Sequence, residues 1–157
     1  MSYIELSKTN NENIKILIFA EGTVLKPKSL FSLYNHNAYL PIGNCVNLIN
    51  EWSKQGAEIV YCTSCKGKKA LEMADILRRY GFAGTKIYYR NKGEKYKDVI
   101  ETVKPTILIE DDCRSIGGSW QMCITNVGSQ LKKLIKSIVV KEFKGIDNLS
   151  QNISELQ

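Results

Sequence analysis

Short apolar runs alternate with amphipathic segments along this chain. Runs rich in Ile, Val and Tyr predict buried strands, because a strand covered on both faces reads as continuous apolar sequence. Between these runs, apolar residues recur at spacings of three and four, which predicts helices that bury one face. The strands are expected at 14–20, 58–63, 86–89 and 106–110, and the helices at 41–56, 70–81 and 94–103.

The pattern is less regular in three other segments. Residues 22–40 have no clear period and are expected to form a loop or a small lid. A short strand is expected over 123–127 and a helix over 131–138, where Leu and Ile follow a helical spacing. The polar residues 147–157 are expected to fray.

Repeated strand–helix units predict an α/β fold. The expected architecture is a three-layer, Rossmann-like, doubly wound and mainly parallel sheet with helices on both faces. The length of 157 residues suits one domain over 1–157 with its core at about 14–141, and 43% hydrophobic residues exclude a disordered chain.

Charge and cysteine content bear on the ligand, the cellular compartment and the state of the thiols. The net charge is +6 and is spread evenly along the chain, which is compatible with an anionic ligand. The charge does not by itself indicate nucleic acid, although nucleic acid is not excluded as a partner. No apolar run is long enough to span a bilayer and no secretory signal is visible, so we expect a cytoplasmic protein without a membrane partner. Cys62 and Cys65 have redox or zinc-ligand spacing, but five cysteines without a second close pair favour buried free thiols.

Polar side chains follow three of the predicted strands. They are Glu21-Gly22-Thr23, Thr63-Ser64 and Glu110-Asp111-Asp112, and Lys95 and Lys97 lie just before the last of these strands. Ligands of open α/β sheets bind at the carboxyl ends of the strands. Carboxylates, hydroxyls and an amine at one sheet edge predict a site for a phosphate and a divalent cation.

These motifs, in this order, resemble the haloacid dehalogenase superfamily. The resemblance covers roughly residues 14–128 and is carried by Ile16 to Val24, Ile59 to Ser64, Lys97 and Ile107 to Asp112. It implies a Rossmann-like sheet and a magnesium-dependent phosphohydrolase with an aspartate nucleophile. The short segment 24–41 resembles a minimal cap, a type that often accepts bulky or macromolecular substrates.

The resemblance assigns roles to individual residues. Thr63 or Ser64 matches the hydroxyl that binds the transferring phosphoryl group, and Lys97 matches the lysine that neutralises it, with Lys95 as the alternative. Glu110 and Asp111, with Asp112 in reserve, match the acidic pair that completes Mg²⁺ coordination. The residues assigned to substrate binding are Gly22, Thr23, Lys95 and His36.

Each assignment has a structural alternative. A hydroxyl after a strand is commonly a helix N-cap, and a lysine on a helix is commonly just solvated. His36 is more often a packing or surface residue than a substrate contact. Trp120 could stack on a base, although burial is the commoner outcome for an aromatic side chain.

The first motif departs from the family at its reactive position. Phe19 stands where the nucleophilic aspartate belongs, or Ala20 if the strand end carries a bulge, and Glu21 stands where the acid/base aspartate belongs. We therefore expect a degenerate phosphatase-like protein that binds a cation, weakly, and a phosphate-bearing small molecule or nucleotide. The alternatives are an active metal-dependent phosphohydrolase using Glu21 with Glu110 and Asp111, and a non-catalytic interaction module.

Overall fold

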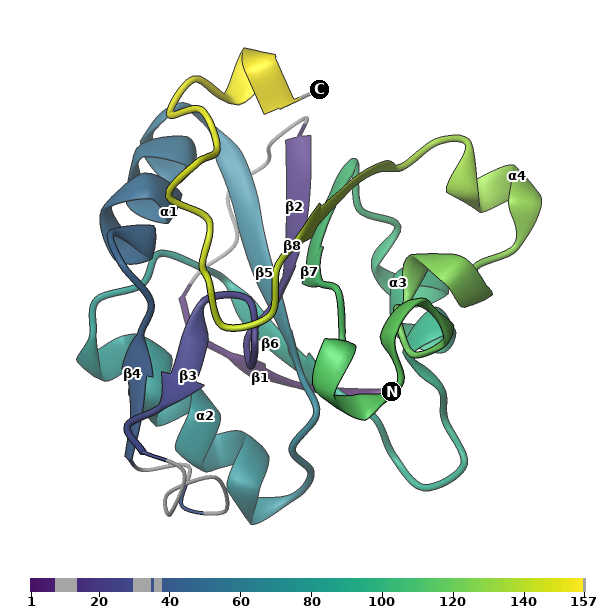
Figure 1. The fold of residues 1–157 in the computed structure, drawn as a ribbon, viewed down its shortest axis with the longest axis horizontal. Coiled ribbons are helices and arrows are strands. Elements are labelled where there is room, and N and C mark those ends of the chain that lie inside the picture. Colours follow the sequence, from purple (N-terminus) through teal and green to yellow (C-terminus); the bar gives the residue numbers. More distant parts are fainter. Residues whose placement is uncertain (8–13, 30–34, 36–37, 157) are drawn as a thin grey trace.

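The fold was determined as a computed structural model that describes residues 1–7, 14–29, 35 and 38–156. Its main sheet has six strands in the order β1-β6-β5-β2-β7-β8 (Figure 1). Only β1 runs antiparallel to its neighbour, so the expected mainly parallel sheet is confirmed. The strands are β1 Ser2–Glu5, β2 Ile14–Phe19, β5 Ala57–Thr63, β6 Lys86–Tyr89, β7 Ile107–Asp111 and β8 Lys136–Val140.

Helices cover both faces of this sheet and complete three layers. On one face lie α1 (Cys45–Lys54) and α2 (Lys68–Arg79), whose apolar sides join one buried cluster. On the other lie α3 (Tyr96–Val103) and the short turns that follow β7, which contribute to a second cluster. Figure 1 shows the two helix groups on opposite sides of the sheet. Among the described residues, no helix is long and apolar enough to cross a bilayer.

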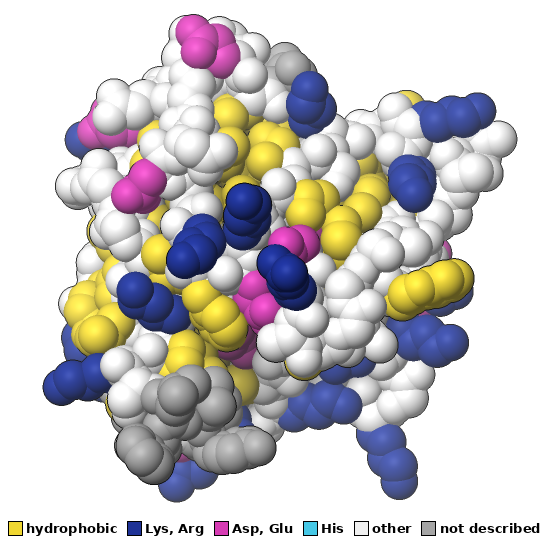
Figure 2. All heavy atoms as spheres, viewed as in Figure 1, with side chains coloured by type: hydrophobic (Ala, Val, Ile, Leu, Met, Phe, Trp, Pro, Cys, Tyr) yellow, Lys and Arg dark blue, Asp and Glu magenta, His cyan; other side chains and the backbone are white. Residues whose placement is uncertain are grey.

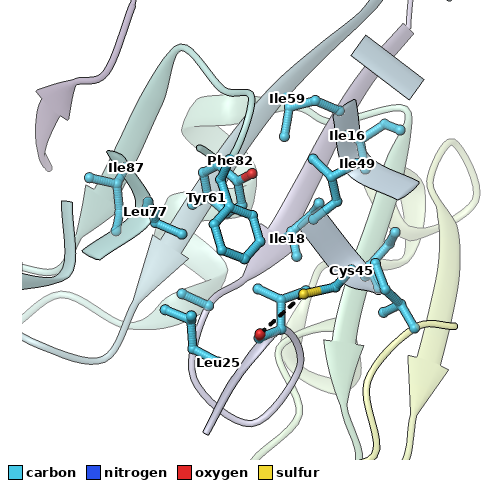
Figure 3. Close-up of a cluster of buried hydrophobic side chains, with 14 of the residues drawn as sticks. Ile16, Ile18, Leu25, Cys45, Ile49, Ile59, Tyr61, Leu77, Phe82 and Ile87 are labelled. Carbon is cyan, nitrogen blue, oxygen red and sulfur yellow. Dashed lines mark hydrogen bonds between the residues drawn. The ribbon is translucent and has the colours of Figure 1, made fainter. Parts of the chain in front are cut away.

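Strand β2 lies at the centre of the sheet and sends alternate side chains to the two clusters. Ile16 and Ile18 pack in the first, while Leu17 packs in the second with Phe19 against it. In the first cluster, drawn in Figure 3, Ile18 lies beside Tyr61, its register partner on β5. Burial on both faces explains why β2 reads as a continuous apolar run.

The segment between β2 and α1 is a small hairpin. Strands β3 (Leu25–Pro27) and β4 (Tyr39–Pro41) pair antiparallel, and Leu25 and Tyr39 are buried. The thiol of Cys45 donates to the Val24 carbonyl at 3.4 Å, which ties this segment to α1 (Figure 3). His36 lies outside the described residues, so its assigned contact and the small lid stay predictions.

Two predictions for the later part of the chain were wrong. The helix expected over 131–138 is instead the four-residue α4 (Ser129–Lys132), followed by β8, which pairs with β7 through Ile109 and Ile138. The strand expected over 123–127 is a 3₁₀ helix, η5 (Ile124–Asn126). Here a buried carboxylate, described below, binds the amides that begin the turn and overrides the β-branched sequence.

Both ends of the described chain are more ordered than the sequence indicated. Residues 147–156 do not fray: the Trp52 indole donates to the Ser150 carbonyl at 2.9 Å, and Ile153 and Leu156 are buried in η6 (Ile153–Leu156). At the other end, β1 was not predicted. It adds to the sheet edge beside β6, where Tyr3 packs on Tyr88 at 5.6 Å between ring centroids.

Candidate functional site

A cavity of about 150 Å³ opens where the carboxyl ends of β2, β5 and β7 meet. We call it the strand-end cavity. Among the described residues, its lining includes no Lys, Arg or His side chain. Figure 2 shows acidic side chains grouped near the centre of one face, with Lys and Arg side chains around them. The carboxylates that line the cavity are Glu21, Glu110, Asp111 and Glu142, and the aromatic side chains are Phe19, Tyr39, Tyr96 and Phe143.

The carboxylate of Glu21 accepts the hydrogen bonds of the donor groups at the end of β5. Its Oε1 accepts hydrogen bonds from Thr63 Oγ1 at 2.7 Å, Ser64 Oγ at 2.7 Å and the Ser64 amide at 3.0 Å. The structure therefore brings Glu21, Thr63 and Ser64 together, as the sequence predicted. However, the hydroxyls and amide that were expected to bind a phosphate bind a carboxylate of the same chain.

Phe19, rather than Ala20, faces the cavity at the end of β2. The Phe19 ring meets the Tyr96 ring edge-on, with 5.2 Å between centroids and 72° between planes. Ala20 is fully buried, and its amide donates to the Cys62 carbonyl at 2.8 Å. The position beside the cavity thus carries an apolar ring that can neither attack phosphorus nor bind a metal.

Gly22 and Thr23 pack closely against Asp111. Gly22 has a φ of +83°, and a Cβ added there would lie 2.7 Å from Asp111 Oδ1. Thr23 Oγ1 donates to Asp111 Oδ1 at 3.3 Å, and the Cys113 amide donates to Asp111 Oδ2 at 3.0 Å. Burial raises the pKa of Asp111, and the nearby charge of Glu142 raises it further. A cation beside Asp111 would relieve both effects.

Glu110 is turned toward the backbone of the following segment. Its carboxylate accepts hydrogen bonds from the Cys123 amide at 2.6 Å and the Ile124 amide at 2.9 Å, where η5 begins. Burial raises the pKa of Glu110, while these two amides oppose the shift. The side chain therefore anchors η5, although it also lines the strand-end cavity.

The acidic cluster that could hold a metal differs from the predicted one. One carboxylate oxygen from each of Asp111, Asp112 and Glu142 lies within 4.8 Å of the other two. The predicted Asp111 and Asp112 are present, whereas Glu142 replaces Glu110. Three carboxylate oxygens are the hard ligands that Mg²⁺ prefers, so the donor set fits this ion. Glu142 follows β8, and a correct strand prediction there would have revealed it.

Hydrogen bonds hold this cluster in place. Asp112 Oδ1 accepts from the Glu142 amide at 3.1 Å. The Glu142 carboxylate accepts from the Ser115 amide at 2.8 Å and the Ser115 hydroxyl at 2.6 Å. The three carboxylates are thus preorganised at the ends of β7 and β8.

Lys95 and Lys97 do not line the strand-end cavity in the part of the chain that the structure describes. They line a separate cavity of about 370 Å³ together with Arg90 and Trp120. We call it the basic cavity. The expected burial of Trp120 was wrong, since its side chain is 82% exposed. Arg90 was not predicted as a site residue.

The cysteine pair shows no sign of thiol activation. Cys62 and Cys65 are buried free thiols, as the sequence indicated. Burial, and next the negative charge of Glu21, raises the pKa of Cys65 to about 12. Burial likewise raises the pKa of Cys62 far above its ordinary value. Neither group becomes a thiolate near neutral pH, which argues against redox or nucleophilic chemistry.

Comparisons with known proteins give a likeness in fold and no match to a family. No family model and no curated protein matches the chain. Among solved structures, the fold is similar to that of D,D-heptose 1,7-bisphosphate phosphatase from Burkholderia thailandensis, with a TM-score of 0.48 and 10% sequence identity. The similarity covers 84% of this chain and 94% of that chain. A likeness at this level carries no argument for a family or an activity, which must rest on the site itself.

Proposed function

We propose that this protein is a phosphatase-like domain of the haloacid dehalogenase type that has lost phosphoryl transfer. It binds a divalent cation and, beside it, a phosphate-bearing ligand at the strand-end cavity. The observation that carries the proposal is the Phe19 ring at the end of β2, next to carboxylates that could hold a cation. Without a carboxylate at this position, no aspartyl-phosphate intermediate can form.

The cation would be held by Asp111, Asp112 and Glu142, and Mg²⁺ is the ion we expect. When bound, it would supply positive charge that the described lining of the cavity lacks and so attract phosphate oxygens. The size of the cavity supports this assignment. Its volume of about 150 Å³ suits a hydrated ion with one phosphate group rather than an entire substrate.

The hydrogen bonds of Glu21 support the loss of turnover. An oxygen of Glu21 is held by Thr63 and Ser64, so a phosphate must displace this carboxylate to reach the same donors. Removing that competitor by Glu21→Ala should therefore strengthen binding of inorganic phosphate in the presence of Mg²⁺, as measured by calorimetry. Glu51→Ala, on the exposed side of α1, is the matched control and should leave phosphate binding unchanged.

The cation is tested by thermal unfolding with Mg²⁺ or Mn²⁺. Millimolar metal should raise the melting temperature of the wild type by mass action, and Asp111→Asn should abolish the shift. The control is Asp75→Asn, the same substitution at an exposed site on α2. An equal response of wild type and Asp111→Asn would contradict the cation site and leave the interaction module as the better description.

Catalysis is tested separately with a generic phosphate monoester. We expect phosphate release at background level with and without Mg²⁺. Metal-dependent release that is lost in Glu21→Gln would overturn the proposal. It would establish instead an active hydrolase in which Glu21 serves as the base.

A further inference from the structure

The basic cavity has an unusual charge balance for this molecule. Its volume of about 370 Å³ falls within the range of small-molecule sites, about 300–1,000 Å³. Arg90, Lys95 and Lys97 line it, and its described lining includes no Asp or Glu. It adjoins the strand-end cavity, since Tyr96, Ile116 and Gln121 line both.

The cations of this cavity have no acidic partner in the part of the chain that the structure describes. The four ion pairs among the described residues do not include Arg90, Lys95 or Lys97. The nearest acids in sequence are committed elsewhere: Glu94 pairs with the amino terminus, and Asp98 accepts from the Lys95 amide at 2.7 Å. An anionic ligand would therefore meet positive charge that the fold leaves uncompensated.

The Arg90 guanidinium packs on an aromatic ring. Its guanidinium carbon lies 3.7 Å from the centroid of the Tyr96 ring, and that ring is packed against Phe19. The Arg90 Nε is buried and has no hydrogen-bond partner. A buried donor without a partner is costly. Arg90 also lines the cavity, and the N–H groups of a guanidinium are donors that bind an oxyanion well.

Trp120 supplies a flat apolar surface at the same cavity. Its side chain is 82% exposed, although a large aromatic ring gains most by burial. Its backbone is fixed, because the Asn126 side-chain amide donates to the Trp120 carbonyl at 3.2 Å and to the Met122 carbonyl at 3.1 Å. The ring is thus presented on an anchored turn.

We infer that the basic cavity binds a nucleotide, with its base stacked on Trp120 and its phosphate held by Arg90, Lys95 and Lys97. An aromatic platform beside uncompensated cations is the combination that recognises bases joined to phosphates. This inference goes beyond the proposed function and does not depend on it, because none of these four residues lines the strand-end cavity. A free nucleotide and a single-stranded nucleic acid present the same chemistry, and the experiment separates them.

Binding is measured by calorimetry with a nucleoside monophosphate, a single-stranded oligonucleotide and inorganic phosphate, each in the presence of EDTA. Tryptophan fluorescence locates the ligand, because Trp52 is fully buried and Trp120 is exposed. We expect nucleotide binding that persists in EDTA and quenches Trp120. Insensitivity to EDTA separates this result from the cation site, which requires metal.

Matched variants identify the contacts. Trp120→Ala should weaken binding about tenfold, which is within the contribution of one base stack, and Trp120→Phe should recover part of the loss. Lys97→Ala should also weaken binding, whereas Lys68→Ala, on α2 across the sheet, should not. An oligonucleotide that binds about tenfold tighter than the monophosphate, with a salt dependence that Lys97→Ala reduces by about one ion, indicates a nucleic-acid strand. Equal affinities indicate a free nucleotide.

Three outcomes would overturn the inference. The first is no binding of either nucleotide form, including the case in which anionic vesicles bind instead. The second is nucleotide binding that Trp120→Ala and Lys97→Ala leave unchanged. The third is inorganic phosphate binding as tightly as the nucleotide, because the base would then contribute nothing.

Discussion

The two adjoining cavities differ in how their polar groups are satisfied. In the strand-end cavity, Glu21, Glu110, Asp111 and Glu142 each accept hydrogen bonds from this chain. In the basic cavity, Arg90 Nε has no hydrogen-bond partner and the three cations have no acidic partner among the described residues. Groups that the fold satisfies support stability, whereas groups that it leaves unsatisfied are available to a ligand. Substitutions should therefore cost more stability in the strand-end cavity than in the basic cavity.

The largest loss of stability is expected from Gly22→Ala. The new methyl group would enter a backbone region unfavourable to Ala and press against Asp111. Gly81→Ala is the matched control, because its φ of +71° is similar but no atom lies within 4 Å of the added Cβ. Gly22→Ala should cost about 1–3 kcal/mol more than the control in the free energy of unfolding. Equal losses would mean that the contact with Asp111 relaxes freely.

Glu110→Gln should have the next largest effect. Each oxygen of the Glu110 carboxylate accepts a hydrogen bond from one amide, Cys123 or Ile124. A glutamine side chain has one oxygen and one NH₂ group, so it can accept from one of these amides, and its NH₂ group would face the other. We expect a loss of about 1–3 kcal/mol in denaturant unfolding, because a buried donor loses its partner. Glu101→Gln, an exposed control on α3, should change stability by no more than about 0.5 kcal/mol. If Glu110→Gln loses no more stability than the control Glu101→Gln, η5 does not depend on the Glu110 carboxylate.

The pH dependence of stability should reveal the same buried carboxyls. The pKa values of Glu110 and Asp111 are raised from 4.5 and 3.8, so the folded state binds more protons than the unfolded state above these values. The free energy of unfolding should therefore fall as the pH rises from the ordinary pKa values of these groups to their raised values in the folded state. Lowering the pH from neutrality into this range should increase it. Unfolding by urea at several pH values measures the slope, which Glu110→Gln should reduce. An unchanged slope would assign the pH dependence to other groups.

The smallest effects on stability are expected in the basic cavity. Trp120→Ala and Lys97→Ala remove side chains that make no hydrogen bond or ion pair with the residues that the structure describes, and Trp120 is mostly exposed. Both should change the free energy of unfolding by no more than about 0.5 kcal/mol, as measured by denaturant unfolding. A loss above about 1 kcal/mol in either variant would mean that this cavity too is built for stability, and the contrast between the two regions would disappear.

The sequence predicts the centre of the fold better than its margin. Strands β2, β5 and β7 are mostly buried on both faces, and this burial makes long stretches of their sequences apolar. Strand β8 was missed because Leu131, Leu134, Ile135 and Ile138 also fit a helical spacing. What makes this segment a strand is its pairing with β7, a long-range contact that a local pattern does not contain.

The candidate site likewise contains residues whose positions the sequence predicts and residues whose positions it does not. Glu21, Thr63 and Asp111 could be predicted to meet because parallel strands end at one edge of the sheet. The position of Lys97 could not, because it depends on how the first turn of α3 packs against the segment after β7. Glu142 was missed because its strand was missed. The direction of the Glu110 side chain depends on the amides of η5, where the sequence indicated a strand.

The C-terminal segment has a consequence for how the protein is made. The amide of Ile153 donates to Gln55 Oε1 at 3.0 Å, the Asp147 carboxylate accepts from the Asn44 amide at 2.9 Å, and Ser150 binds the Trp52 indole. A nascent chain that has not yet released these residues from the ribosome therefore leaves α1 partly uncovered. Because domains fold as cooperative units during synthesis, α1 gains its final cover only after residues 147–156 have left the ribosome. Until then the Trp52 indole, which is fully buried in the complete fold, lacks the Ser150 carbonyl that accepts its hydrogen bond.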